Sequence, residues 1–545
     1  MSAEPPPQRG RRGLRTLIED ALPKERFGDH LTLLSGTGQN IVGLGVFVAA
    51  SLGTSVLISR VLGAPALGLV TLATQFAFIG GAGTRFGMDM AAVRRVAIDV
   101  GKGEPGRSRG VVRRAAGIAA AVSFAVALLM FVGASVLADV FASHSPHGVA
   151  TRAFQGAALA LPFVALCQVY LGGTRGLKIM RHTLFVYWSG QPIAWILLML
   201  AGWVVSTSVG VSMLAYAGSW FLATLAAWAL WERESRRFPH LRAEAGETRE
   251  LLRYGAPRAP AALLSQLLFW TDYFVLSAVG HVSAAQLGVY AAAVRVAQAL
   301  VLFLIAVNYM FSPFVADLYA RGERDRLNGL YKALTRWTLA GTIPILLLLM
   351  VVPGAVLHVF GSVGFASGTT ELRILLIGQF VNVAVGSVGF ILIMVGRTGW
   401  DLVVYAGSFL LDLVVALILV PKLGADGAAI AQATTLTVSN AVRLVLVWRF
   451  VRIQPFSRPY FRLAIPAAAG LLTMVGVNLV LANAAWWVDL IVTGAVGSIV
   501  YVMVLLAFAL SPTERTAAER ILRRRRTRGP GAGSAAAVDE IGKDT

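Results

Sequence analysis

Apolar stretches of about 20 residues recur from Leu34 almost to Leu510, and this repetition constrains the fold more than any other feature. A helix needs about 20 mostly apolar residues to cross a bilayer. The chain has 545 residues, of which 57% are hydrophobic and 14% are charged, and its mean hydropathy is +0.70. The sequence therefore predicts an all-α polytopic membrane protein with about fourteen transmembrane helices. The predicted spans are 34–58, 66–88, 115–139, 153–173, 184–205, 209–231, 259–280, 287–312, 334–356, 372–395, 400–421, 425–448, 461–482 and 486–510.

The distribution of basic residues orients these spans. Most of the 48 Lys and Arg fall in the termini and in the alternate loops that share their side. Cytoplasmic loops collect Lys and Arg, so both termini are predicted to be cytoplasmic, with the chain in the inner membrane. This spread also argues against nucleic acid as the reason for the net charge of +20, and the cluster Arg523–Arg526 suits anionic lipid. The exceptions are Arg60, Arg152, Arg373 and Lys422 on the opposite side, and Arg85, Arg295 and Arg443 within spans.

Two flanking segments are not predicted to span the membrane. Residues 1–30 lack a continuous apolar signal segment, and 12–27 has the spacing of an amphipathic surface helix. Residues 511–545 are basic, then rich in small and polar residues, which predicts a disordered tail.

A repeated segment indicates the domain plan. Residues 66–75 and 286–295 share a Leu-Gly pair at an offset of 220 residues, and both follow an outward-going span. Two parallel pseudo-repeats of six helices are therefore predicted, followed by an extra C-terminal helix pair. The predicted units are an N-lobe (31–231), a cytoplasmic linker (232–258), a C-lobe (259–450) and the pair of helices 13 and 14 (451–510).

Several short motifs accompany this plan, namely Ile58–Gly63 (ISRVLG), Leu251–Gly255 (LLRYG), Trp270–Phe274 (WTDYF), Leu287–Tyr290 (LGVY), Ser312–Phe314 (SPF) and Gly424–Ala429 (GADGAA). Together with the six-plus-six-plus-two plan they resemble the multidrug/oligosaccharidyl-lipid/polysaccharide (MOP) exporter superfamily, and within it the Wzx-like polysaccharide-transport branch. The resemblance implies a flippase that moves a polyprenyl-diphosphate-linked sugar by alternating access. It also implies contact with other membrane proteins of polysaccharide biosynthesis. The family's drug exporters have twelve helices, so the extra pair favours a lipid-linked substrate.

Ionisable residues inside spans are the first candidates for function, because each costs about 2.5 to 3.5 kcal/mol on insertion scales. Asp272 and Arg295 are predicted at matching depth on consecutive helices, either as a structural ion pair or as part of a substrate cavity. Gln75 occupies the position in the first repeat that Arg295 holds in the second. A guanidinium facing amides would suit a diphosphate with sugar hydroxyls.

Further polar residues complete the candidate set. Arg85 and Asp89 would guide the headgroup inward or form an interfacial pair, and Asp412 would couple transport to a proton or sodium gradient. Asn40, Gln298 and Asn382 are predicted to bind substrate or to form interhelical hydrogen bonds, as are Gln39, Gln266, Asn308 and Gln379.

Other chemistries have little support in the sequence. Cys167 is interpreted as a residue packed in the core. His144 and His147 lack further metal ligands, and the sequence contains no phosphate-binding glycine loop. No catalytic residue, metal or cofactor is predicted, and the protein is not expected to be an enzyme. The alternatives kept open are a cation-coupled multidrug exporter, a peptidoglycan lipid-precursor flippase and a membrane glycosyltransferase or polymerase.

Overall fold

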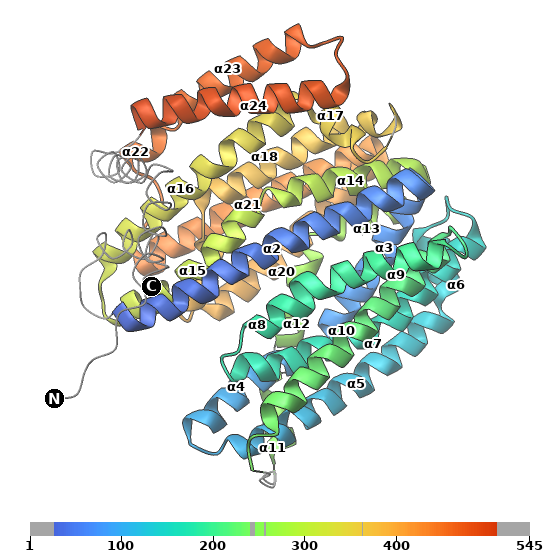
Figure 1. The fold of residues 1–545 in the computed structure, drawn as a ribbon, viewed down its shortest axis with the longest axis vertical. Coiled ribbons are helices and arrows are strands. Elements are labelled where there is room, and N and C mark those ends of the chain that lie inside the picture. The colour runs from blue at the N-terminus through green and yellow to red at the C-terminus, as the bar shows by residue number, and fades with distance from the viewer. Residues whose placement is uncertain (1–26, 240–245, 256–257, 362, 510–545) are drawn as a thin grey trace, which may run out of the picture.

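The protein is built from helices in the computed structural model, which describes residues 27–239, 246–255, 258–361 and 363–509 (Figure 1). In these ranges every regular element is helical. Twelve helices are long and apolar enough to cross a membrane, or thirteen if one bent pair counts as a span. The predicted fold class is confirmed. The predicted span 259–280 consists of two short helices, which is why it is absent from that count.

The N-terminal half contains one long helix, α2, and a bundle around α7. Helix α2 runs across the middle of the molecule, between this bundle and the C-terminal half (Figure 1). The helices are α2 (Phe27–Leu62), α3 (Ala64–Thr84), α4 (Met88–Gly101), η1 (Pro105–Arg107), α5 (Ser108–Val132), α6 (Ala134–Phe141), α7 (His147–Gly176), α8 (Arg181–Thr183), the π-helix η2 (Leu184–Gly190), α9 (Gln191–Trp203) and α10 (Val209–Ser235).

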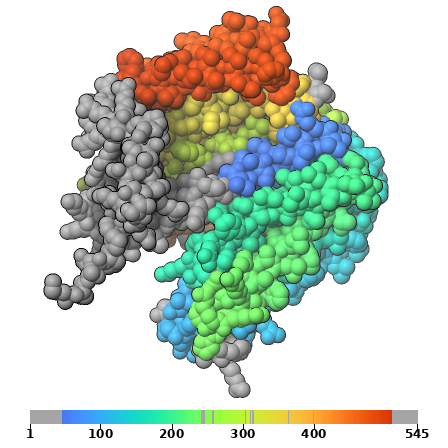
Figure 2. Space-filling view, in the orientation of Figure 1, coloured from blue at the N-terminus to red at the C-terminus, as the bar shows by residue number. Residues whose placement is uncertain are grey.

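The C-terminal half packs around α18, α20 and α21, and the last helices form a separate ridge against α16 (Figures 1 and 2). Its helices are α12 (Arg258–Leu267), α13 (Thr271–Val279), α14 (Ala284–Ala299), α15 (Leu302–Ala320), α16 (Arg324–Val351), α17 (Pro353–His358), η3 (Val363–Gly368), α18 (Thr369–Val385), α19 (Val388–Met394), α20 (Thr398–Leu423) and α21 (Ala425–Val451). The ridge contains α22 (Arg458–Phe461), α23 (Ala464–Val480), α24 (Trp486–Val504) and η4 (Leu505–Ala509).

Two spans of the C-terminal half are broken. The pair α18 and α19 bends by 46° at Gly386, whose φ of 69° favours glycine. Here the hydroxyl of Tyr331 donates to the Val385 carbonyl at 2.6 Å. Between α12 and α13 the side chain of Gln432 donates to the Phe269 carbonyl at 3.2 Å. These bonds satisfy backbone groups that a break would otherwise leave unpaired in lipid.

Among the described residues, one buried apolar cluster joins the two halves, and it lies toward one end of the molecule. A single apolar cluster runs from α3, α6, α7 and α10 into α13, α14, α18 and α20. At the other end the core is divided into a cluster of α4, α5, α7, α10 and the helix α11 (Glu247–Gly255) and a second cluster of α15, α16, α19 and α21. The charge pattern predicts that the joined end faces outside, and we call it the outer end.

Two glycines allow the backbones of the two halves to approach each other closely at the outer end. A Cβ on Gly68 of α3 would lie 2.8 Å from the backbone nitrogen of Gly288 on α14, and a Cβ on Gly288 would lie 1.8 Å from the Ala64 carbonyl oxygen. These are the glycines of the two repeated segments. The Tyr273 hydroxyl also donates to the Gly68 carbonyl at 2.8 Å. Only glycine permits this backbone contact.

The linker helix α11 (Glu247–Gly255) docks on the N-terminal half at the divided end. Its Glu250 accepts from Arg95 at 2.8 Å, and its Glu247 accepts from Arg114 at 3.0 Å. Burial raises the pKa of Glu247 despite the neighbouring arginines, and burial likewise raises the pKa of Asp99. The apolar Leu251 is 3% exposed and anchors α11 in the core.

Some predictions fall on residues outside the described ranges. They are the amphipathic segment, of which only Phe27 is described, and the tail 511–545. Cys167 is fully buried in the core, as predicted.

Candidate functional site

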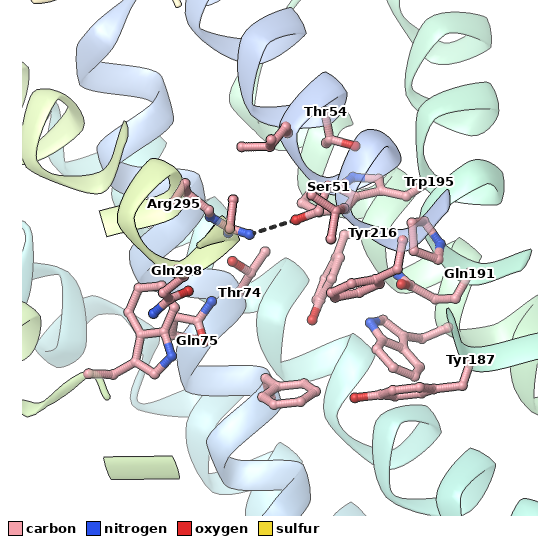
Figure 3. Close-up of a pocket in the computed structure, with 18 residues that line it drawn as sticks. Ser51, Thr54, Thr74, Gln75, Tyr187, Gln191, Trp195, Tyr216, Arg295 and Gln298 are labelled. Carbon is pink, nitrogen blue, oxygen red and sulfur yellow. Dashed lines mark hydrogen bonds between the residues drawn. The ribbon is translucent and has the colours of Figure 1, made fainter. Parts of the chain in front are cut away.

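A cavity of about 250 Å³ lies between the two halves (Figure 3). Most of its wall comes from the N-terminal half, and α14 and Trp270 close it from the C-terminal half. Among the described residues that line it, Arg295 alone carries a formal charge and none is acidic. The lining residues are Phe47, Val48, Ser51, Leu52, Thr54, Thr74, Gln75, Phe78, Tyr187, Gln191, Pro192, Trp195, Tyr216, Trp220, Trp270, Arg295, Gln298 and Ala299.

Arg295 projects from α14 toward α2. One terminal nitrogen donates to the Ser51 hydroxyl at 3.0 Å, and the guanidinium carbon lies 5.9 Å from the centre of the Trp270 ring. The buried Nε has no hydrogen-bond partner among the described residues. A guanidinium offers five donors in a planar fork that matches phosphate oxygens. Arg295 therefore keeps donors for an anionic ligand.

Amide side chains flank this cation. Gln75 of α3 and Gln298 of α14 lie beside Arg295 at the cavity wall (Figure 3). Gln298 follows Arg295 by three residues on one helix, a spacing that puts both on the same side of it. The structure thus brings together three of the predicted substrate residues. Each amide supplies a donor and an acceptor for sugar hydroxyls.

An aromatic wall faces Arg295 across the cavity (Figure 3). Tyr187 lies in the π-helix η2, Trp195 in α9, and Tyr216 and Trp220 in α10. Their rings pack edge to face or tilted, with centroids 4.7 Å apart for Trp195 and Tyr216 and 5.9 Å apart for Tyr187 and Trp220. The predicted site did not include this wall.

A sequence signal for the aromatic wall did exist. Tyr187, Gln191 and Trp195 are spaced four residues apart, as are Tyr216 and Trp220, and this spacing puts each series on one helix face. Aromatic residues in spans are common in lipid-facing and core positions, so the pattern gains meaning only when the two faces converge.

Asp272 and Arg295 do not form the ion pair that was one of the two roles predicted for them. Asp272 accepts a hydrogen bond from the Tyr290 hydroxyl, whereas Arg295 bonds to Ser51. The prediction assumed an unbroken helix over 259–280. The break between α12 and α13 changes the helical register at Trp270, so Asp272 turns into the C-terminal half and away from the cavity.

Asp272 instead lies near Asp412, the second predicted coupling residue. Both are fully buried, and Asp412 lies within electrostatic range of Asp272. The Thr435 hydroxyl donates to Asp412 Oδ1 at 3.3 Å. Asp272 Oδ1 and Asp412 Oδ2 have no hydrogen-bond partner among the described residues. Two buried carboxyl groups in one another's electric field do not readily ionise together, so the pair can hold a proton.

Arg85, Asp89 and Asn382 are not among the residues that line the cavity. Arg85 and Asp89 form an ion pair at 3.5 Å, and they flank the turn between α3 and α4. Asn382 accepts from Asn440 of α21 at 3.2 Å, which is the interhelical bonding foreseen as the alternative, and it donates to Gln379 of its own helix at 3.3 Å. Asn40 lies in α2, where its side chain is outside the described ones.

Arg443, which the sequence places within a span, is buried in the C-terminal half. It is 8% exposed, lies 3.5 Å from Asp401, and donates to the Ser439 hydroxyl at 3.0 Å. Its guanidinium also covers the ring of Tyr405 at 4.7 Å. Gly389 of the broken helix α19 faces this side chain, and a Cβ there would make an ordinary contact with Arg443 Cδ at 3.6 Å. Arg443 is thus part of the C-terminal half's interior.

The chain is similar to one protein family in sequence and to several transporters in fold. The MatE family model matches residues 41–200. An inward-facing multidrug resistance MATE transporter of the MOP superfamily is similar at 14% identity and a TM-score of 0.64, over 76% of this chain and 98% of that chain. The lipid II flippase MurJ in an inward closed conformation is similar at 14% identity and a TM-score of 0.63, over 85% of this chain and 97% of that chain. The MATE multidrug transporter DinF-BH is similar at 18% identity and a TM-score of 0.57, over 79% of this chain and 97% of that chain.

Among curated protein sequences, none matches this chain. The similar structures named above are transporters or a flippase by description. The chain is a multi-pass membrane protein with a MatE domain signature at residues 41–200 and the fold of MOP-superfamily transporters.

Proposed function

We propose that this protein is a flippase that moves a polyprenyl-diphosphate-linked oligosaccharide, or a related polysaccharide precursor, from the inner to the outer face of the cytoplasmic membrane. The observation that carries the proposal is Arg295, the one formally charged side chain among the described residues of the cavity wall. An unneutralised cation in a low-dielectric cavity favours an anionic ligand. The diphosphate of a lipid-linked sugar is such a ligand.

The division of the core supports alternating access. The halves share one core at the outer end and have separate cores at the other, so the cavity is closed from outside by packing of α3 on α14. A packed interface of this kind has discrete closed and open arrangements. The headgroup would enter from the divided end, and the halves would then rock to open the outer end. The lipid tail would remain in the bilayer.

A proton or sodium gradient would supply the energy for transport, and the carboxyl pair Asp272 and Asp412 would couple transport to that gradient. Their site lies inside the C-terminal half, beside the break between α12 and α13. Trp270 belongs to the same break and lines the cavity. Binding of a proton or sodium ion by the carboxyl pair can therefore alter the position of a cavity residue two positions away. This coupling is part of the proposal.

A peptidoglycan-precursor flippase is the second candidate, and one observation favours it. The lipid II flippase covers 85% of this chain, compared with 76% and 79% for the multidrug transporters. The extra coverage is comparable in length to the ridge Arg458–Ala509. Both flippase candidates share the diphosphate and the lipid tail. A multidrug exporter of lipophilic cations is disfavoured, because Arg295 would repel such substrates.

The test is a comparison of substrates with the full-length protein in liposomes. Fluorescent polyprenyl-diphosphate saccharides, lipid II and a lipophilic dye cation would be offered in parallel, and transfer between leaflets would be measured. The proposal predicts transfer of at least one polyprenyl-diphosphate saccharide. Transport of the dye cation with no transfer of either diphosphate lipid would contradict it, and transfer of lipid II alone would establish the second candidate.

A further inference from the structure

We infer that the aromatic wall is a pyranose-binding subsite that recognises the sugar attached directly to the diphosphate. The inference rests on the proposed function and names which part of the substrate the cavity selects. The wall consists of Tyr187, Trp195, Tyr216 and Trp220, with Gln191 between the rings.

The chemistry of the wall suits a sugar ring. One face of a pyranose carries C–H groups, which are electropositive and pack against the electron-rich face of an aromatic ring. Ring hydroxyls need donors and acceptors. The Gln191 amide, which donates to the Ser219 hydroxyl at 3.0 Å, supplies further groups of both kinds.

An unused donor points to a ligand on this wall. The indole Nε1 of Trp220 is buried and lies near the Tyr216 hydroxyl without forming a well-aligned hydrogen bond to it. By contrast, the indole of Trp195 donates to the Ser212 carbonyl at 3.0 Å and is held in place. Buried indole N–H groups are usually paired. A sugar oxygen would satisfy the Trp220 donor.

The position of the wall relative to Arg295 matches the covalent structure of the substrate. Tyr216 lies within electrostatic range of Arg295, so the aromatic wall begins where the phosphate site ends. In a glycosyl diphosphate the first sugar is bonded directly to phosphate. A diphosphate held by Arg295, Gln75 and Gln298 would therefore bring that first sugar onto the aromatic wall.

The size of the cavity limits recognition to this part of the substrate. Its volume is about 250 Å³. Sites that enclose drug-sized ligands have volumes of about 300–1,000 Å³. The lining residues can therefore contact only the part of the headgroup nearest the diphosphate, while more distal sugars extend beyond them. We expect selection of the first sugar and tolerance of the distal ones.

Binding of a ligand series to the purified full-length protein tests the subsite. The probes are a sugar-free polyprenyl diphosphate and three polyprenyl diphosphates that carry glucose, galactose or N-acetylglucosamine. Wild type should bind at least one monosaccharide probe about tenfold more tightly than the sugar-free lipid, which is the range of a single stacking contact. Tyr187→Leu should remove this preference and leave affinity for the sugar-free lipid within about twofold.

Two further variants complete the design. Trp220→Phe keeps the ring and removes the unused N–H donor, and it should reduce the preference for a sugar even if Tyr187→Leu proves poorly folded. Trp228→Leu is the matched control, because Trp228 lies on the same helix α10 but is 47% exposed on its outer surface. It should bind all probes as wild type does.

The outcomes separate the subsite from the proposed function. Equal wild-type affinity for sugar-free and all three monosaccharide lipids would overturn the subsite and leave the flippase proposal standing. An unchanged sugar preference in both Tyr187→Leu and Trp220→Phe would also overturn it. Failure of wild type to bind any polyprenyl diphosphate would instead refute the proposed function.

Discussion

Replacement of Gly288 by alanine should open the outer end of the molecule. A Cβ on Gly288 would lie 1.8 Å from the Ala64 carbonyl oxygen and 2.6 Å from its carbon, whereas ordinary contacts are 3.4–4 Å. The obstructing atoms are backbone, so no side chain can rotate away. Helices α3 and α14 must separate, and in a two-state transporter the outer-open arrangement relieves this clash.

The size of the effect follows from the cost of overpacking. An extra methyl group in a well-packed interface costs about 1–3 kcal/mol. If the outer-open state escapes this cost, the ratio of open to closed protein rises by about 5- to 150-fold. Gly68→Ala should act in the same direction, because its Cβ would lie 2.8 Å from the Gly288 backbone nitrogen.

Cysteine accessibility measures this shift. Cys167 is fully buried, so the chain has little background reactivity, and Cys167→Ala would remove it. Leu69→Cys would place a reporter on α3 in a small outer cavity between the halves. A membrane-impermeant maleimide added from outside should label this reporter faster in the Gly288→Ala background, in proportion to the open population.

Gly354→Ala provides the control, since a Cβ there would meet no atom within 4 Å. It should leave the labelling rate unchanged. The reasoning is refuted if Gly288→Ala retains the wild-type thermal stability and the wild-type labelling rate. That result would mean that the glycine contact does not hold the outer end closed.

Three further predictions concern coupling, the outer contact and the linker. Asp412→Asn should retain substrate binding but abolish stimulation of flipping by an imposed proton or sodium gradient; stimulation equal to wild type would exclude this carboxyl from coupling. Arg60→Gln should raise labelling at the outer end less than Gly288→Ala does, because it removes only hydrogen bonds of 2.8 and 3.0 Å to the Val359 and His358 carbonyls. Burial raises the pKa of Glu247, so docking of α11 should strengthen as pH falls toward its ordinary value of 4.5 and weaken as pH rises through the raised value, as hydrogen exchange of α11 would report. Glu247→Gln should reduce that dependence, and an unchanged pH profile would contradict the assignment.

The membrane-spanning architecture could be predicted because lipid imposes a simple length and polarity requirement on every span. The apolar stretches correspond to the observed helices, and Gln75, Arg295 and Gln298 were identified because polar groups in such stretches are costly. The shared Leu-Gly pair also pointed to Gly68 and Gly288, which meet at the outer end.

The environment of Asp272 could not be predicted from the sequence. The segment between α12 and α13 reads Leu268-Phe269-Trp270, which contains neither glycine nor proline. At the break the Phe269 carbonyl accepts a hydrogen bond from Gln432, a residue 163 positions away, and such a distant partner is not evident from the local sequence. Without the break Asp272 would be expected beside Arg295. The aromatic wall was missed for a related reason, since it forms only where the continuous segment of η2 and α9 converges on α10.

Transfer of lipid-linked sugar in liposomes by Arg295 variants tests the central claim most directly. The full-length protein would be reconstituted with a fluorescent polyprenyl-diphosphate saccharide that wild type transfers, and Arg295→Ala and Arg295→Lys would be compared with Trp228→Leu. The account predicts wild-type transfer by Trp228→Leu, loss of transfer in Arg295→Ala, and partial activity in Arg295→Lys, which keeps the charge but loses the planar fork. Normal transfer by a correctly folded Arg295→Ala would contradict the claim that this cavity binds the diphosphate.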